Sequence, residues 1–207
     1  MIGFYSLPKN EIWDSYGTLS ARLPSALGSL FLMLMIGDTL FCWPQKGDRQ
    51  FLTPIVASLC FALSPLIIIW SRTAVSDALL TGTLGISLLL FWRRMASENN
   101  DQCISAWVFL GFTILVKGPV AIVLALLTIT TFLFCQKNWK TLLSKINPKK
   151  GFLITTLISV PWYILELLKE GKPFWDNFFG YHNFQRYTSV VNNHAEPFWF
   201  FLYIMIL

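Results

Sequence analysis

Charged side chains recur where long apolar runs of this sequence meet. Arg72 and Asp77 lie in Ser-Arg-Thr-Ala-Val-Ser-Asp between two such runs, and Lys117 lies in Val-Lys-Gly-Pro between two more. A carboxylate at an apolar boundary usually needs a cation or a helix amino end, and a lysine or arginine there could hold a phosphate. The spacing therefore predicts a polar site along one edge of a membrane, facing one compartment.

A later polar segment, residues 180–197, adds further candidates on what should be the same side. Arg186 offers a forked donor suited to phosphate. His182 and His194 could each be a metal ligand, a hydrogen-bond donor or a plain exposed residue. Aromatic residues precede and enter this segment at helical spacing, which predicts a helix lying along the interface: Phe174, Phe178, Tyr181 and Phe184.

Each of the three earlier charges also has a purely structural interpretation. Asp77 could cap the helix that follows it. Arg72 could anchor the chain at the interface, or pair with Asp77 or with a phosphate. Lys117 could extend its ammonium group to the interface, although it marks a tight turn with Pro119 suited to the first turn of the next helix. These alternatives stay open at this point.

Composition predicts an all-α, polytopic membrane helical bundle. Hydrophobic residues make up 55% of the 207 residues and charged residues 13%, with a mean hydropathy of +0.56. A spanning helix needs ~20 mostly apolar residues. Six runs fit this requirement, and a seventh begins at residue 198: 23–41, 52–70, 78–92, 104–116, 120–134 and 152–168. The third and fourth runs are short, so their helices should extend through flanking residues or tilt.

Lysines and arginines alternate between the two sets of loops. One set contains nine of them, in short connections: Lys46, Arg49, Arg93, Arg94, Lys137, Lys140, Lys145, Lys149 and Lys150. Because such loops tend to remain cytoplasmic, the site of Arg72, Asp77 and Lys117 should face the non-cytoplasmic side of the plasma (inner) membrane. The net charge of +5 is then a topology signal with some attraction to membrane lipids. No nucleic-acid motif accompanies it.

Four cysteines are scattered through the chain and form no Cys-x-x-Cys pair: Cys42, Cys60, Cys103 and Cys135. A disulfide framework or a zinc site is therefore not expected, and the four are interpreted as packing residues.

An ordered series of short motifs resembles bacterial polyprenyl-phosphate-sugar glycosyltransferases, the family that contains lipid A aminoarabinose transferase and the protein O-mannosyltransferases. The motifs extend over nearly the whole chain: Ser20-Ala-Arg-Leu-Pro-Ser-Ala-Leu27, Ser64-Pro65, Ser71-Arg-Thr-Ala-Val-Ser-Asp77, Val116-Lys-Gly-Pro119, Pro161-Trp162, Phe178-Phe-Gly-Tyr-His-Asn-Phe-Gln-Arg186 and His194-Ala-Glu-Pro-Phe-Trp199.

The resemblance implies a C-type glycosyltransferase fold and sugar transfer from a polyprenyl-phosphate donor to a lipid, glycan or protein acceptor outside the cytoplasm. It supports contact of Lys117 with the donor phosphate, for which Arg186 and Arg72 are candidates by their chemistry, and it implies that Asp77 lies near the active-site cavity as at most an accessory catalytic residue. His182 and His194 would be polar or metal contacts. No cofactor is certain from the sequence, and a divalent cation could belong to the complete enzyme.

The family's Asp-Glu loop and Glu-Lys-Pro-Pro stretch do not occur before Ser20. The chain is therefore interpreted as one membrane domain, residues 1–207, lacking the amino-terminal catalytic loop and the carboxy-terminal region, and we expect it to be inactive alone. A non-catalytic membrane scaffold or remnant, and a small-solute transporter, are the two alternative functions.

Overall fold

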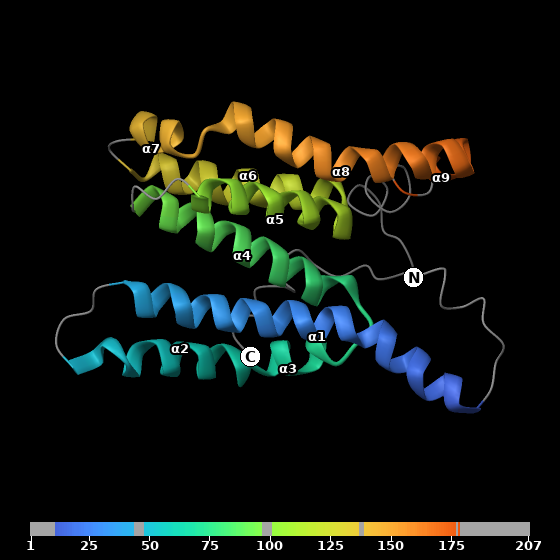
Figure 1. Cartoon of the computed structure of the whole chain (residues 1–207), viewed down its shortest axis with the longest axis horizontal. Helices are drawn as coiled ribbons and strands as arrows, with labels where there is room; N and C mark the ends of the chain where they lie inside the picture. Colours follow the sequence, from blue (N-terminus) through green and yellow to red (C-terminus); the bar gives the residue numbers. More distant parts are fainter. Residues whose placement is uncertain (1–10, 44–47, 97–100, 137–138, 177, 179–207) are drawn as a thin grey trace, which may run out of the picture. The chain divides into compact units, whose positions relative to one another are not determined.

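The computed structural model describes residues 11–43, 48–96, 101–136, 139–176 and 178, and every regular element in these ranges is helical, which confirms the all-α prediction there. The elements follow in chain order (Figure 1): α1 Glu11–Cys42, the 3-10 helix η2 Asp48–Gln50, α2 Leu52–Ala62, α3 Pro65–Ser71, α4 Ser76–Ala96, α5 Asp101–Lys117, α6 Pro119–Phe134, α7 Trp139–Lys145, α8 Pro148–Glu170 and α9 Lys172–Trp175. The chain divides into two compact units, Met1–Val160 and Pro161–Leu207.

Several helices have the length and apolarity of membrane spans. Ser20–Cys42 and Pro148–Glu170 each meet both requirements, and α2 with α3 adds a third span if that bent pair is counted as one. The helices α5 and α6 are apolar but shorter. As expected, α4 extends through its flanking residues to 21 residues. These features support a membrane bundle, whereas the count of six spans is not confirmed and the predicted start of a seventh lies outside the described residues.

The span predicted for residues 52–70 is not one continuous helix, because it breaks between α2 and α3. The axes of α2 and α3 are bent by 62° at the break. Ser64 takes an extended conformation, with φ −60° and ψ 125°, as is usual for a residue that precedes a proline. Pro65 has no N–H to continue the helical hydrogen bonds and instead begins α3.

The centre of the first unit is α4, which packs against α1 on one side and α5 on the other (Figure 1). Glycines permit the close crossing of α1 and α4: a Cβ atom on Gly82 would lie 2.5 Å from the carbonyl oxygen of Gly28. Small residues at such crossings let two backbones approach closely in a bilayer. Phe91 and Ala106, which are 1% and 0% exposed, lie in the core around α4 and α5.

Where α4 ends and α5 begins, side chains donate to backbone carbonyls of the α7–α8 connection. The buried Arg94 donates from Nε to the carbonyl oxygen of Lys145 at 3.1 Å. The carbonyl oxygen of Ile146 accepts from Sγ of Cys103 at 3.0 Å and from Nε1 of Trp107 at 2.8 Å. We call this region the Arg94 end. The three side-chain donors of this region are hydrogen-bonded to backbone carbonyls, which are fixed by the packing of the helices.

In the second unit, aromatic rings make most of the described contacts. Phe174 stacks on Phe178 with ring centroids 5.4 Å apart and packs edge-on against Trp162 at 6.1 Å. The predicted aromatic spacing therefore brings its first two members together, whereas Tyr181 and Phe184 lie outside the described residues.

A polar site beside an apolar groove

Asp77 and Lys117 form an ion pair at the end of the first unit opposite the Arg94 end. Asp77 lies in the first turn of α4 and Lys117 in the last turn of α5. Because α4 and α5 are consecutive, packed helices, the start of one and the end of the other lie side by side (Figure 1). The two side chains are 27% and 32% exposed. We call this region the Lys117 end; its two charges contact each other and are partly exposed.

The turn after Lys117 is a single residue long. Gly118 has φ 68° and ψ −138°, and its N–H donates to the carbonyl oxygen of Ile114 at 2.7 Å. An L side chain at this φ would be strained, so glycine suits the position. Pro119 then begins α6, which confirms the tight turn predicted from Lys-Gly-Pro.

A second contact ties two of the predicted motifs together. Ser25 is buried in α1, and its Oγ donates to the carbonyl oxygen of Val75 at 2.9 Å. Val75 lies directly before α4, in the loop that carries Arg72 to Asp77. The motif around Pro24 and the motif around Asp77 therefore meet in space, although 50 residues separate their two hydrogen-bonding partners.

Arg72 does not pair with Asp77, because the carboxylate pairs with Lys117. Arg72 ends α3, where its N–H donates to the carbonyl oxygen of Ile69 at 3.3 Å. Its side chain is exposed. The structure thus leaves this guanidinium group exposed in the loop that leads to Asp77.

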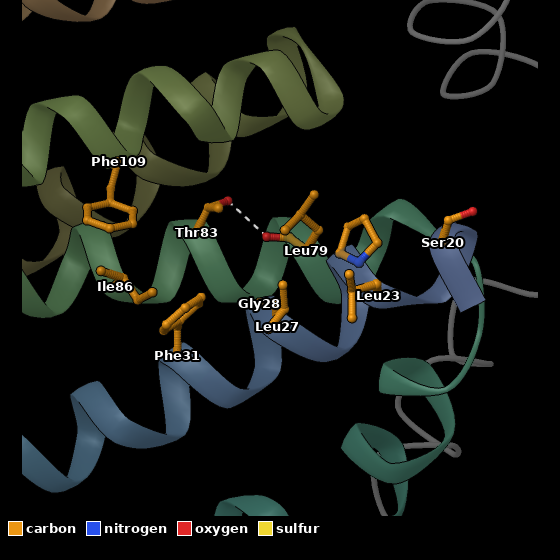
Figure 2. A pocket seen from close by; sticks show the side chains of 10 residues that line it. Ser20, Leu23, Leu27, Gly28, Phe31, Leu79, Thr83, Ile86 and Phe109 are labelled. Atoms are coloured by element: carbon orange, nitrogen blue, oxygen red, sulfur yellow. Dashed lines mark hydrogen bonds between the residues drawn. The ribbon is translucent and has the colours of Figure 1, made fainter. Parts of the chain in front are cut away.

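An apolar groove of about 440 Å³ lies along the first half of α4 (Figure 2). Side chains of α1, α4 and α5 line it: Ser20, Leu23, Pro24, Leu27, Gly28, Phe31, Leu79, Thr83, Ile86 and Phe109. Ser20 lies at one end of the groove and Phe109 toward the other. The hydroxyl of Thr83 donates to the carbonyl oxygen of Leu79 at 2.9 Å, so a backbone partner already satisfies this polar group.

Leu79 is the groove residue nearest in sequence to Asp77. It lines the groove two residues after Asp77 along α4, a rise of about 3 Å, although side chains two residues apart point to different sides of a helix. The sequence did not indicate this groove, because its walls are apolar residues that look like lipid-facing ones. A cation near an apolar groove suits a ligand with an anionic head and an apolar tail.

The remaining predicted site residues, His182, Arg186 and His194, lie outside the described residues. In the ranges that the structure describes, no three His, Cys, Asp or Glu side chains come close enough to hold a metal ion.

The chain is similar to known proteins over most of its length. Residues 4–171 match the family described as dolichyl-phosphate-mannose-protein mannosyltransferase. Similar proteins include undecaprenyl phosphate-alpha-4-amino-4-deoxy-L-arabinose arabinosyl transferases of Erwinia tasmaniensis, which is 24% identical over 87% of this chain and 33% of its own length, and of Pseudomonas aeruginosa, which is 24% identical over 93% of this chain and 34% of its own length.

The undecaprenyl phosphate-alpha-4-amino-4-deoxy-L-arabinose arabinosyl transferase 2 of Pseudomonas fluorescens is 23% identical over 99% of this chain and 37% of its own length. The chain thus spans about a third of the length of these relatives. No solved structure matches the chain.

Proposed function

Because the chain belongs to the dolichyl-phosphate-mannose-protein mannosyltransferase family, we propose that it is part of a membrane glycosyltransferase. In this proposal the enzyme moves a sugar from a polyprenyl-phosphate donor to a lipid, glycan or protein acceptor. The chain lies in the plasma membrane as a multi-pass protein, with its site on the non-cytoplasmic side. The names of the relatives, which specify an undecaprenyl-phosphate sugar, support this class of donor.

The main support for the proposal is that the Asp77–Lys117 pair lies at the start of α4, whose first half lines the apolar groove. A polyprenyl phosphate has a doubly charged or singly charged head and a long apolar tail. The ammonium group of Lys117 suits the head, and the groove suits isoprene units, whose burial stabilises binding by about 25 cal/mol per Å² of apolar surface. Neither feature alone distinguishes a donor site from an ordinary membrane boundary.

Lys117 acts on the phosphate in this proposal. When the sugar leaves, negative charge grows on the departing phosphate, and an ammonium group already held nearby stabilises that charge without reorganising. Asp77 holds Lys117 in place before the donor arrives and then shares it with the phosphate oxygens. Asp77 is thus an accessory residue, and no residue of this chain is assigned as the base that activates the acceptor.

Four further residues belong to the proposal through their chemistry. Arg72, exposed near Asp77 in sequence, supplies a second cation for the phosphate. Arg186 has the same role, and His182 and His194 are proposed as polar or metal contacts. No cofactor is required by this scheme, although a divalent cation remains compatible with the complete enzyme.

Binding of undecaprenyl phosphate to the purified chain in detergent tests the proposal, with undecaprenol as the uncharged comparison. We expect the phosphate lipid to bind more tightly than the alcohol, and Lys117→Gln to weaken the phosphate lipid about tenfold, since a hydrogen bond to a charged group contributes about 1.5–3 kcal/mol. Lys169→Gln, at an exposed lysine in the second unit, is the matched control and should change nothing.

Equal affinity of the two lipids, or an unchanged affinity in Lys117→Gln, would remove the donor site and leave the membrane-scaffold interpretation. In that case the ion pair would be only a structural link between α4 and α5.

A further inference from the structure

A second basic region lies at the other end of the first unit and has no part in the proposed donor site. Residues 137–150 contain five lysines and no acidic residue, and the acidic residues nearest in sequence are Asp101 and Glu166. Such a concentration of one sign of charge gives the segment a strong positive potential. The structure describes four of these lysines, Lys137 being outside the described ranges.

The structure separates the four lysines into two groups. Lys145 turns inward: its Nζ donates to the carbonyl oxygen of Met95 at 3.3 Å, while its own carbonyl oxygen accepts from Arg94. Lys140, Lys149 and Lys150 are exposed. Within the described part of the chain, none of these three has an acidic partner.

Buried contacts fix the helices that carry the exposed lysines. Ile146 is 2% exposed, and Leu142 and Leu143 pack against the same hydrophobic core. Gly151 lies against the ring of Trp107, which is itself held by the carbonyl oxygen of Ile146. The positions of α7 and of the first turn of α8 are therefore fixed by buried contacts, so that the lysine backbones need no ordering when a ligand binds.

An aromatic residue lies among the cations. Trp139 begins α7 with its ring 47% exposed. The Nζ atom of Lys140 lies 5.5 Å from the centroid of this ring. Tryptophan is enriched at the level of lipid headgroups, where an amphipathic ring is favoured. This combination distinguishes the region from a basic surface that faces bulk water.

We propose that Trp139, Lys140, Lys149 and Lys150 form a docking surface for anionic glycerophospholipids, with the lipid phosphate held by the three ammonium groups and the tryptophan ring beside the glycerol backbone. The occupant is a bilayer lipid rather than a soluble phosphate, because the surface joins an exposed interfacial ring to cations on helices of an apolar bundle. The surface takes up lipid independently of the Lys117 site.

Native mass spectrometry of the full chain tests this surface, using dioleoyl phosphatidylglycerol against dioleoyl phosphatidylcholine. We expect the wild-type chain to retain phosphatidylglycerol preferentially. The variant K140Q/K149Q/K150Q should lose that preference, with a fall in bound phosphatidylglycerol of at least about tenfold, given roughly fivefold per lysine near a charged membrane surface.

The matched control is K169Q/K172Q, which removes two exposed lysines that lie near Glu166 and Glu170 in the second unit. It should leave the preference for phosphatidylglycerol unchanged. The single variants K140Q, K149Q and K150Q preserve the test if the triple variant does not fold, because each should show a part of the loss.

Two results would overturn the proposal: no preference for phosphatidylglycerol in the wild-type chain, or a full preference in the folded triple variant. Binding of undecaprenyl phosphate to the same triple variant separates the two proposals. That binding should persist if the donor site at Lys117 is correct, whatever happens to phosphatidylglycerol.

Discussion

The two ends of the α4–α5 pair keep their charges in different ways. At the Arg94 end, a buried guanidinium group donates to the carbonyl oxygen of Lys145, and Ile146 accepts from two further side chains. At the Lys117 end, a partly exposed ammonium group pairs with the carboxylate of Asp77. A backbone carbonyl in a packed connection cannot leave, whereas a side-chain carboxylate can be replaced by a phosphate. The Arg94 end also has an ion pair, between Arg93 and the exposed carboxylate of Asp38. The contrast is therefore between Arg94 and Lys117 themselves, one held by a backbone carbonyl and the other by a side chain.

The largest effect should come from the crossing that lies between the two ends. Gly82→Val places a side chain against the backbone of Gly28, where a Cβ atom would lie only 2.5 Å from the carbonyl oxygen. Since two backbones must separate, we expect a loss of about 3 kcal/mol in the free energy of unfolding, measured by titration with a denaturing detergent. Thr81→Val, at an exposed position of the same helix, is the control. Equal stability of the two variants would contradict the close crossing.

Breaking the Arg94 end should lower stability without affecting lipid binding. Arg94→Met leaves the carbonyl oxygen of Lys145 without its donor, which should cost about 1–3 kcal/mol. The affinity for undecaprenyl phosphate should stay unchanged. A fall in that affinity, in a variant that remains helical by circular dichroism, would mean that the two ends are coupled and that the contrast between them is wrong.

A smaller effect is expected from the contact that fixes the loop before α4. Ser25→Ala removes the hydrogen bond to the carbonyl oxygen of Val75 and should cost about 1 kcal/mol. Hydrogen exchange should become faster in residues 72–77 and stay unchanged around Lys145 and Ile146. Ser29→Ala is the matched control, since the Ser29 hydroxyl bonds only within its own helix, to the carbonyl oxygen of Ser25.

The smallest expected effect is a gain in affinity rather than a loss, and it tests whether Asp77 competes with a phosphate for Lys117. Asp77→Asn frees the ammonium group of Lys117, so the affinity for undecaprenyl phosphate should rise about two- to fivefold, because a partly exposed ion pair contributes about 0.2–1 kcal/mol. The unfolding free energy should fall by a similar amount. A weaker affinity in Asp77→Asn would indicate that the carboxylate positions Lys117 more than it competes for it.

The sequence predicted the Lys117 end better than the Arg94 end. Charges at the junctions of apolar runs mark helix ends, and consecutive helices bring such ends together, so Asp77 and Lys117 could be placed on one edge in advance. The partner of Asp77 could not, because Arg72 was closer along the chain. Arg94 was counted only as a topology signal, since sequence does not reveal which loop arginine will turn inward to a carbonyl.

The sequence also did not predict that α1 packs on α4. Gly28 and Gly82 lie in long apolar runs, and in a membrane protein the surface facing lipid and the surface facing another helix have similar residues. The groove beside them depends on that packing and so escaped prediction too. The break at Ser64 and Pro65 carried a signal in its proline, but the uninterrupted hydrophobicity of residues 52–70 favoured one span.

Because of that break, the position of Arg72 depends on the angle between α2 and α3. The seven residues of α3 follow α2 through the bend at Ser64 and pack against α1 and α4, and at 1.5 Å per residue α3 is about 10 Å long. A swing of ~20° about the bend would move the end that bears Arg72 by ~4 Å, which is more than the length of a hydrogen bond. A small angular change far from the ion pair is thus enough to bring this guanidinium group into reach of a phosphate or to withdraw it.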